Sequence, residues 1–429
     1  MRFVFIAHYF PPVNSSGAKR VEALSKYLVA AGHEVAVITT SKTASDGAFT
    51  EEVPKGVKLI ELSRFGFERP SQETGSTFQP MYTGKPSFNR RLKDWVMRQM
   101  GQLPDPRLPF SLAFLNPWLA KNVQDTLRLA DVVIGSSPPW PMLLAALIVK
   151  RRFGVPCILD YRDHFSECHE MPGGPTAKWL EKLIDRRLVR GADHVVTISE
   201  PMTSYYRTMT NRITTIPNGY DHDVLEVARK CAKVSATDDV LIRYMGIVSP
   251  GRISHNFFQA LEIFKNEQPA RFSRIRVEFF GNAALVEQAL RERYLTIGSA
   301  FHFFAAVPYL TSLQRIVESD YLLFCETSSK ASISAQGILT TKLFEYIGSG
   351  RPVLADISSD TLAGSLLLRC GGQHVVSDTR DAFLATLRSD DFFLRKPDDV
   401  SEMASSLSRQ AQARQYAKLA AELVKNVEN

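Results

Sequence analysis

The sequence predicts an α/β protein made of two Rossmann-like domains, each built on a doubly wound parallel sheet. Short apolar runs of strand length alternate with segments of helical periodicity, first over residues 2–217 and again over residues 240–357. A polar stretch of small residues at 223–237 separates the two series and is expected to be a linker. The chain has 429 residues, more than one core of ordinary size accommodates, which also favours two domains.

The first series begins with the apolar run 2–8, followed by a turn and a helix-patterned segment that ends at Gly32. The run 33–40 completes a strand–helix–strand unit, which implies parallel pairing through a right-handed crossover. Residues 42–110 are rich in Ser, Gly, Thr and Pro, which predicts an insertion with loops. The alternation then resumes, with strands expected at 131–137, 156–163, 194–199 and 212–217 and helices around 141–153 and 175–190.

The second series repeats this pattern. Strands are expected at 240–246, 275–281, 301–307, 321–327 and 352–357, and helices near 255–266, 283–295, 311–318 and 341–349. We therefore expect an N-terminal domain over 1–222, a C-terminal domain over 223–399, and a terminal helix within 400–429 that can pack back on the N-terminal domain. Ligands of such domains bind at the carboxyl ends of the strands, and for two facing domains this means the cleft between them.

The composition is that of a soluble globular protein, with 45% hydrophobic and 23% charged residues. The five cysteines include no CxxC pair, and Cys157 and Cys325 lie in apolar runs; this argues against a disulfide framework or a zinc site and favours a reducing cytoplasm. The apolar N-terminus lacks a small-residue cleavage site, which predicts a buried strand and not a signal peptide. No apolar run reaches the ~18 residues that a membrane span needs.

The net charge of +7 indicates an anionic partner. The sequence has no RNP-type strand, no zinc finger and no long basic run, so no nucleic-acid partner is expected. Phosphate-bearing ligands together with a membrane surface explain the charge most simply.

The segment 337–352, GILTTKLFEYIGSGRP, is the first candidate site. Thr340 or Thr341 can cap a helix whose free amides and dipole favour a phosphate. Glu345, about one turn further, offers two acceptors to the two donors of a ribose cis-diol. Gly350 and Pro352 are expected to end the helix. The alternative is an ordinary amphipathic helix whose core side is formed by Leu343, Phe344 and Ile347.

The same segment resembles the C-terminal signature of glycosyltransferase family 4, the large retaining family of the GT-B fold. Other segments resemble this family in the expected order along nearly the whole chain. They are HYFPPVNSSGAKR (8–20) in the first loop of the acceptor domain, SSPPWPMLLAA (136–146) and LDYRDHF (159–165) in its middle, GADHVVTISEPM (191–202) and IPNGYD (216–221) at its end, GIVSPGR (246–252) in the first loop of the donor domain, and VPYLTSL (307–313) at the base-binding turn.

The resemblance implies a donor site. Arg252 matches the basic residue that contacts the diphosphate, and Glu345 matches the ribose carboxylate. Gly17 matches the glycine that lets the first loop approach the donor, because glycine can adopt a positive φ and has no side chain. The base-binding backbone matches Val307, Pro308 and Tyr309, and the further donor-site candidates are Gly246, Thr340, Thr341 and Lys342. The candidates on the acceptor side are His8, Asp163, His164 and Asn218, and the catalytic candidates are Arg252, Glu345 and His164.

The sequence departs from the family pattern in three places. Gly337 occupies the position of the first glutamate of the family's paired-glutamate motif, and Glu326 or Gln336 is the candidate substitute. His255 is the nearest counterpart of a second basic residue that the family often has soon after Arg252. The family's active-site histidine in the acceptor domain has no direct match, so His164 is the local candidate; the alternative is that His164 is a partly exposed loop residue.

Asp221 and Asp223 form a DxD pair, which binds a metal in a different glycosyltransferase fold. Because they follow Asn218 and Gly219, turn and helix-capping chemistry is the better interpretation. No metal or other cofactor is expected, since Arg252 and helix amides can stabilise a leaving diphosphate. The reaction implied by the resemblance is sugar transfer from a nucleotide diphosphate sugar to a hydroxyl of a glycan or lipid-linked acceptor. It proceeds with retention, in cell-surface polysaccharide or glycoconjugate biosynthesis.

The segment 88–100, FNRRLKDWVMRQM, has an apolar helical face flanked by basic residues. This composition suits a helix lying on an anionic membrane, so a cytoplasmic protein on the inner face of the plasma membrane is one expectation. The alternative is a helix packed on its own domain. Two rival functions share the fold, namely a sugar-nucleotide 2-epimerase and a non-catalytic sugar-nucleotide-binding protein, and Gly337 keeps the second open.

Overall fold

The computed structural model describes residues 1–15, 17–42, 46, 48–49, 51–63, 99–168, 171, 173–233, 238–326, 339–394 and 400–428. Internal contacts divide the chain into two compact units. Among the described residues, the first unit contains those up to Pro217 and those from Arg409 onward, and the second contains those from Asn218 to Ser408. The sequence-based boundaries at 222 and 399 fall near these positions.

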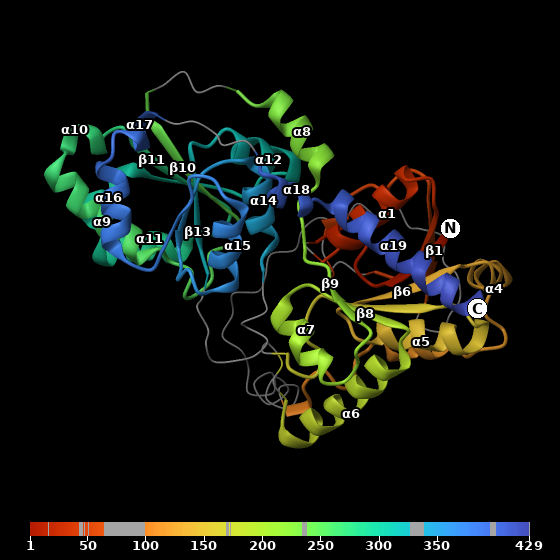
Figure 1. The fold of residues 1–429 in the computed structure, drawn as a ribbon. Helices are drawn as coiled ribbons and strands as arrows, with labels where there is room; N and C mark the ends of the chain where they lie inside the picture. The colour runs from red at the N-terminus through yellow and green to blue at the C-terminus, as the bar shows by residue number, and fades with distance from the viewer. Residues whose placement is uncertain are drawn as a thin grey trace. The chain divides into compact units, whose positions relative to one another are not determined.

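Seven parallel strands form the sheet of the first unit, in the order β5-β3-β1-β6-β7-β8-β9 (Figure 1). The chain winds outward from β1 in both directions, as a doubly wound sheet requires. The strands are β1 (Arg2–Ala7), β3 (Glu34–Thr40), β5 (Val57–Leu62), β6 (Val132–Ser137), β7 (Cys157–Tyr161), β8 (His194–Thr197) and β9 (Ile213–Thr215).

Helices cover both faces of this sheet (Figure 1). On one face Phe3 and Phe5 pack with α1 (Lys19–Ala30) and α19 (Arg409–Glu428); on the other, Val4 and Ile6 pack with α5 (Pro141–Phe153). Burial on both faces explains why β1 reads as one continuous apolar run. The other helices in the described part of this unit are α3 (Leu108–Ala113), α4 (Lys121–Arg128), α6 (Pro175–Gly191) and α7 (Glu200–Arg207).

The insertion expected at 42–110 also contributes a strand to the first sheet, which was not predicted. Val57–Leu62 forms β5, the edge strand, which pairs in parallel with β3. Its alternating sequence VKLIEL buries Ile60 and Leu62, the pattern of a half-buried strand, but the run is short and lies among turn-forming residues. In addition, β4 (Ala48–Phe49) pairs antiparallel with β2 (Val13–Asn14).

Six parallel strands form the sheet of the second unit, in the order β12-β11-β10-β13-β14-β15. Five of them lie where the apolar runs predict strands, whereas the short β15 was not predicted. They are β10 (Val240–Met245), β11 (Ile275–Phe280), β12 (Phe301–Phe304), β13 (Tyr321–Cys325), β14 (Val353–Asp356) and β15 (Val375–Ser377).

Helices also cover both faces of the second sheet (Figure 1). Ile242 and Tyr244 face the core that holds α9 (His255–Glu267), α11 (Ala284–Arg293) and α16 (Arg380–Arg388). Leu322 and Phe324 face the core that holds α12 (Tyr309–Val317), α14 (Thr341–Ser349) and α15 (Leu362–Cys370). The shorter elements are α10 (Pro269–Phe272), α17 (Asp391–Leu394), α18 (Glu402–Ser406) and the 3-10 helix Leu295–Ala300.

The expected linker at 223–237 is largely helical. The helix α8 spans His222–Cys231 and buries Leu225 and Ala228 against the second unit. The Asp221 side chain accepts a hydrogen bond from the Val224 amide at 3.3 Å, so the helix-capping interpretation of this aspartate is confirmed.

All five cysteines are free, and Cys157 and Cys325 are buried in strands as expected. Within the part of the chain that the structure describes, no helix combines the length and the apolar character that crossing a bilayer requires.

Candidate functional site

Two glycines bring the backbone close together at the carboxyl ends of β10 and β11. Gly246 has a φ of 103° and Gly281 a φ of 121°, which only glycine adopts without strain. A Cβ on Gly281 would stand 2.7 Å from the Gly246 carbonyl oxygen, and the Gly246 amide donates to Phe280 O at 2.7 Å. The edge of the sheet is therefore free of side-chain bulk where the first loop of the unit begins.

Lys342 lies beside this glycine. Its ammonium group stands 3.8 Å from the centre of the Tyr244 ring and 3.7 Å from the place that a Cβ on Gly246 would occupy. Burial lowers the pKa of Lys342 to about 8; the charge of Arg252 acts in the same direction, while Glu326 and Glu345 oppose it. The cation–π contact holds the charged head over the ring without neutralising it.

Arg252 lies in the loop that leads from β10 to α9. The Cys325 thiol donates to the Arg252 carbonyl at 2.8 Å, and the Arg252 amide donates to Ser249 O at 3.0 Å, so the loop is fixed at both points. The Arg252 Nε atom is buried and has no hydrogen-bond partner among the described residues. A donor in that state is available to an anionic ligand.

The end of the same loop is anchored from β14. Asp356 accepts hydrogen bonds from the Ser254 hydroxyl at 2.8 Å and from the Asn256 side-chain amide at 2.8 Å. His255, the sequence candidate for a second basic residue, is turned to a different partner, since its Nδ1 lies 2.9 Å from the Tyr294 hydroxyl. The second cation near Arg252 is instead Lys342 of α14, whose pKa the charge of Arg252 lowers.

Glu326 follows β13 directly. Its Oε1 atom is buried and has no hydrogen-bond partner among the described residues. Burial raises the pKa of Glu326, while the charge of Arg252, hydrogen bonds from Thr340 to the carboxylate and the charge of Lys342 oppose this rise. Gln336 and Gly337 lie outside the described residues, so Glu326 is the described candidate for the missing carboxylate.

The core-packing interpretation of the segment around α14 is confirmed, and its phosphate-binding interpretation stays a prediction. Leu343, Phe344 and Ile347 are buried in the core, and Gly350 ends the helix in the left-handed region with a φ of 71°. At the other end, Lys342 and the half-buried Glu345 belong to the first turns. Thr340 occupies the cap position, as expected, but its side chain makes no capping hydrogen bond.

The VPY turn packs near the same helix. Val307 and Tyr309 are partly buried against the core cluster that contains Leu343 and Phe344 of α14. Pro308 is exposed and precedes the first residue of α12. The second unit therefore gathers the charged donor-site candidates at the carboxyl edge of its sheet, and Val307 and Tyr309 pack against the core cluster that includes residues of α14.

In the first unit, His8 directly follows β1 and lies within a polar cluster. It is only 3% exposed; its Nδ1 contacts the Thr40 hydroxyl, and Asp46 Oδ1 and Arg107 Nη2 lie 3.1 and 3.2 Å from its Nε2. Burial lowers the pKa of His8, and nearby Arg107 and Lys42 add to this against the charge of Asp46. The imidazole is thus kept neutral near neutral pH, as a proton acceptor has to be.

Arg162 of the LDYRDHF motif holds two loops together. Arg162 donates to the carbonyls of Gly17, Ser137 and Pro138, which ties the first loop to the loop after β6. Gly17 itself does not have a positive φ, contrary to expectation. A Cβ there would stand 3.2 Å from the Tyr9 ring, so close packing is the reason for a glycine.

His164 is 3% exposed, so the alternative of a partly exposed loop histidine is wrong. Its ring stacks on Tyr206 with centroids 5.6 Å apart and meets Tyr205 edge-on at 5.1 Å. Asp163 beside it is exposed, and Asn218 is half-buried and belongs to the second unit by its contacts. A role for His164 in packing fits this burial better than proton transfer to an acceptor.

Sequence reasoning missed a buried ion pair in the first unit. Arg20 Nη2 lies 3.1 Å from Asp160 Oδ1, and both side chains are almost fully buried. Tyr416 of α19 donates to the same carboxylate oxygen at 2.7 Å, and Arg20 also donates to the carbonyls of Ile216 and Pro217. Arg20 and Asp160 stand inside two of the matched motifs, which was a usable signal, whereas nothing in the sequence points to Tyr416.

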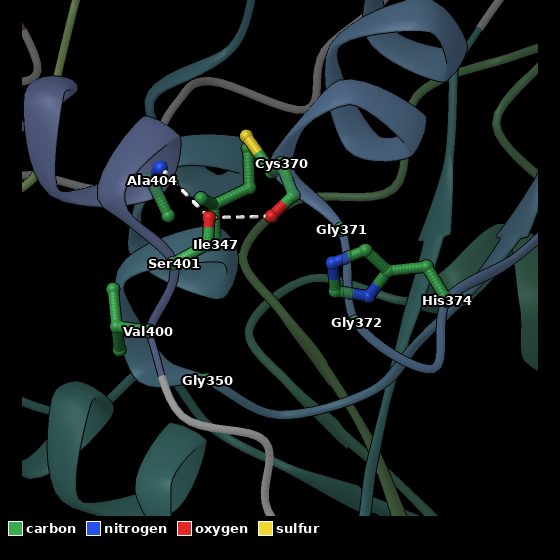
Figure 2. A pocket seen from close by; sticks show the side chains of 9 residues that line it. All are labelled: Ile347, Gly350, Cys370, Gly371, Gly372, His374, Val400, Ser401 and Ala404. Carbon is green, nitrogen blue, oxygen red and sulfur yellow. Dashed lines mark hydrogen bonds between the residues drawn. The ribbon is translucent and has the colours of Figure 1, made fainter.

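A small hollow lies beside the C-terminal end of α14 (Figure 2). Its volume of about 10 Å³ has room for about one water. The Ser401 hydroxyl donates to Cys370 O at 2.5 Å and accepts from the Ala404 amide at 3.1 Å, and His374 Nδ1 accepts from the Val353 amide. These internal bonds and the small volume make the hollow a packing feature that cannot hold a nucleotide.

Comparison with known proteins identifies the relatives. A model of the glycosyl transferase 4-like domain matches residues 17–219. Glycogen synthases from two strains of Mycobacterium tuberculosis, CDC 1551 / Oshkosh and H37Rv, are each 24% identical over 310 residues. The alignment covers 69% of this chain and 66% of each relative, so just under two thirds of their length is represented.

Several solved structures share the fold. Sucrose-phosphate synthase from Thermosynechococcus elongatus superposes with a TM-score of 0.62 at 15% identity, and a glycosyltransferase from Rickettsia africae ESF-5 with 0.58 at 13%. The catalytic domain of starch synthase IV from Arabidopsis thaliana, bound to ADP and acarbose, gives 0.56 at 11%. Each of these three comparisons covers 99% of both chains.

The two parallel sheets and these structural relatives show the GT-B fold, which confirms the predicted fold class. The match of residues 17–219 and the glycogen synthase relatives make the chain similar to glycosyltransferases of family 4.

Proposed function

We propose that the protein transfers a sugar from a nucleotide diphosphate sugar to a hydroxyl of a glycan or lipid-linked acceptor, in cell-surface polysaccharide or glycoconjugate biosynthesis. The observation that carries this proposal is the placement of two cations, Arg252 and Lys342, at the carboxyl edge of the second sheet. Arg252 lowers the pKa of Lys342, so the two charges repel each other. A diphosphate bound between them would remove this repulsion and supply the Arg252 Nε with an acceptor.

The remaining donor contacts follow from the neighbouring elements. Glu345 belongs to the same helix as Lys342, one turn further along, where its carboxylate can accept both hydroxyls of a ribose. Val307, Pro308 and Tyr309 would meet the base through their backbone. Gly246 leaves room for the diphosphate beside the Lys342 ammonium group.

The proposed transfer retains the configuration at the anomeric carbon. The bond between that carbon and the diphosphate oxygen breaks, and the acceptor oxygen forms its new bond on the same face. The departing phosphate oxygen takes the acceptor's proton. Arg252 and Lys342 lower the barrier because their positive charges face the negative charge that develops on the leaving group. These two cations also make a metal ion unnecessary in the proposed mechanism.

Glu326 takes the place of the carboxylate that position 337 lacks. Its Oε1 is buried without a partner among the described residues, beside both cations. Such an acceptor is costly to leave unsatisfied, and a hydroxyl of the transferred sugar would satisfy it. On the acceptor side, we propose His8 and Asp163 as candidates, and we assign His164 to packing.

The test begins with a thermal-shift screen against UDP-, GDP- and dTDP-sugars, since a bound ligand raises the melting temperature by mass action. The donor that stabilises the protein is then used in a nucleotide-release assay with glycan and lipid-linked acceptors. Acceptor-dependent release of nucleotide, with a product whose anomeric configuration matches the donor by proton NMR, supports the proposal. Inverted product would overturn retention, and isomerised donor formed without any acceptor would identify an epimerase instead.

A further inference from the structure

The outer face of α6 in the first unit exposes large apolar side chains. Trp179 is 65% exposed and the adjacent Leu180 is 41% exposed. Met100, on the segment that runs beside this helix, is 38% exposed. A solvated helix face does not normally carry a tryptophan next to a leucine, so this surface is a candidate for burial against something else.

An apolar groove adjoins these side chains. Its volume is about 630 Å³, within the range of ~300–1,000 Å³ that is typical of small-molecule sites. Thr176, Ala177, Leu180 and Ile184 line it from α6, and the opposite wall comes from residues 99–108 and Trp140. Gln99 and Met100 are the described end of the segment 88–100, whose remaining residues 88–98 lie outside the described part of the chain.

On α6 the acidic residues are buried and the exposed charged residues are basic. Its two acidic residues are fully buried: Glu181 accepts from the Gln102 amide at 2.6 Å, and Asp185 accepts from the Tyr161 hydroxyl at 2.9 Å. Its exposed ionisable residues are all basic, namely Lys182, Arg186, Arg187 and Arg190. Lys182 also pairs with Glu167 at 2.8 Å. The solvent side of the helix is therefore cationic as well as apolar.

We propose that α6 and the adjoining groove form a docking site for an anionic phospholipid bilayer. Trp179 and Leu180 insert at the interface, the groove receives the end of one acyl chain, and Arg186 and Arg187 meet lipid phosphates. Tryptophan at the headgroup level, leucine below it and arginine at the phosphates are the composition of helices that lie in a membrane interface. The basic face selects an anionic bilayer over a neutral one or an apolar peptide.

This docking site is independent of the donor site, because every residue in it belongs to the first unit. It also differs from the site expected at 88–100 alone, since the residues that carry it belong to α6. The two regions meet where Gln99 and Met100 line the groove.

Flotation of the full chain with lipid vesicles tests the proposal. The wild-type protein should float with vesicles of phosphatidylglycerol and phosphatidylcholine at low salt, remain free with pure phosphatidylcholine, and dissociate as salt is raised. The double variants Trp179→Ser/Leu180→Ser and Arg186→Glu/Arg187→Glu should each lose at least about tenfold in partitioning, corresponding to ~1.4 kcal/mol. Trp118→Ser is the matched control, because Trp118 is 86% exposed but does not line the groove.

All variants are first checked for an unchanged melting temperature and an unchanged nucleotide-sugar thermal shift, so loss of flotation cannot be attributed to unfolding. Wild-type protein that stays free of anionic vesicles would overturn the proposal. So would equal flotation of wild type and both double variants. A wild-type dimer in light scattering that Trp179→Ser/Leu180→Ser converts to a monomer, without vesicle binding, would assign this face to a second copy of the chain instead.

Discussion

The arginine side chains at the carboxyl edges of the two sheets differ in whether their donors are bonded within the protein. In the first unit, Arg20 is paired with Asp160, and Arg162 donates to three backbone carbonyls, so these charges hold segments of chain together. In the second, Arg252 and Lys342 stand near each other, and Arg252 Nε and Glu326 Oε1 are buried without partners among the described residues. Paired charges fix a framework, whereas two neighbouring cations, one of which has a donor without an acceptor, indicate where an anion binds.

Breaking the buried Arg20–Asp160 pair of the first unit should have the largest effect, on the free energy of unfolding. Asp160→Ala leaves Arg20 buried without its carboxylate and removes the acceptor of the Tyr416 hydroxyl. We expect a loss of about 3–5 kcal/mol in the free energy of unfolding, measured by urea denaturation. Glu200→Ala is the control, since Glu200 pairs with Arg207 at the surface, where such pairs contribute about 0–1 kcal/mol. Equal stability of the Asp160→Ala and Glu200→Ala proteins would contradict the framework role.

In the proposed donor site of the second unit, Glu326→Gln should lower turnover and change the free energy of unfolding little. If the carboxylate bonds a hydroxyl of the transferred sugar, its loss removes a charge-assisted hydrogen bond of about 1.5–3 kcal/mol. Turnover in the nucleotide-release assay should therefore fall by roughly 10–100-fold. Binding of the nucleoside diphosphate without its sugar should stay the same. A matching fall in that binding would move Glu326 from the sugar to the diphosphate.

Lys342 gives a smaller, pH-dependent effect. Burial lowers its pKa to about 8 in the free protein, and a bound diphosphate favours the charged form and raises that pKa. Donor affinity should thus be constant below about pH 8 and fall by up to about tenfold per unit above it, because binding must then take up a proton. Affinity is measured by titration from neutral to alkaline pH.

In Lys342→Met this alkaline fall should be absent, and affinity at neutral pH should be lower. A wild-type profile that stays flat through pH 9 would show that the ammonium group does not meet the diphosphate.

The smallest expected effect is that of metal removal. Since Arg252 and Lys342 supply the positive charge for the leaving diphosphate, dialysis against a chelator should change turnover by less than about twofold. Complete loss of activity, restored by adding a divalent cation, would show that the two cations do not suffice.

The sequence predicted the sheets well because parallel strands covered on both faces read as continuous apolar runs, as in RFVFIA of β1 and YLLFC of β13. It predicted β5 and β15 poorly: β5 alternates within a turn-rich insertion, and β15 has only three half-buried residues. The segment that forms α8 was predicted to be a linker because HDVLEVARKC is short and polar. Leu225 and Ala228 nevertheless form its buried side.

For the site, motif resemblance named Arg252, Lys342 and Glu345, and the structure brings their charges together. The resemblance could not predict which hydrogen bonds the individual side chains make. Thr340 fits a capping position by sequence, yet its hydroxyl does not bond the helix amides. Tyr416 joins the Arg20–Asp160 pair from the far end of the chain, and no local pattern records such a contact.

The most direct test of the donor-site assignment is a calorimetric titration with the nucleoside diphosphate of the donor chosen in the screen. Arg252→Ala should lower its affinity by at least about tenfold, because a charge-assisted contact is worth roughly 1.5–3 kcal/mol. Arg388→Ala, which removes only a surface pair with Glu267, should bind as tightly as the wild-type protein. Equal affinity of Arg252→Ala and wild type, with the fold intact, would contradict the assignment of this sheet edge to the diphosphate.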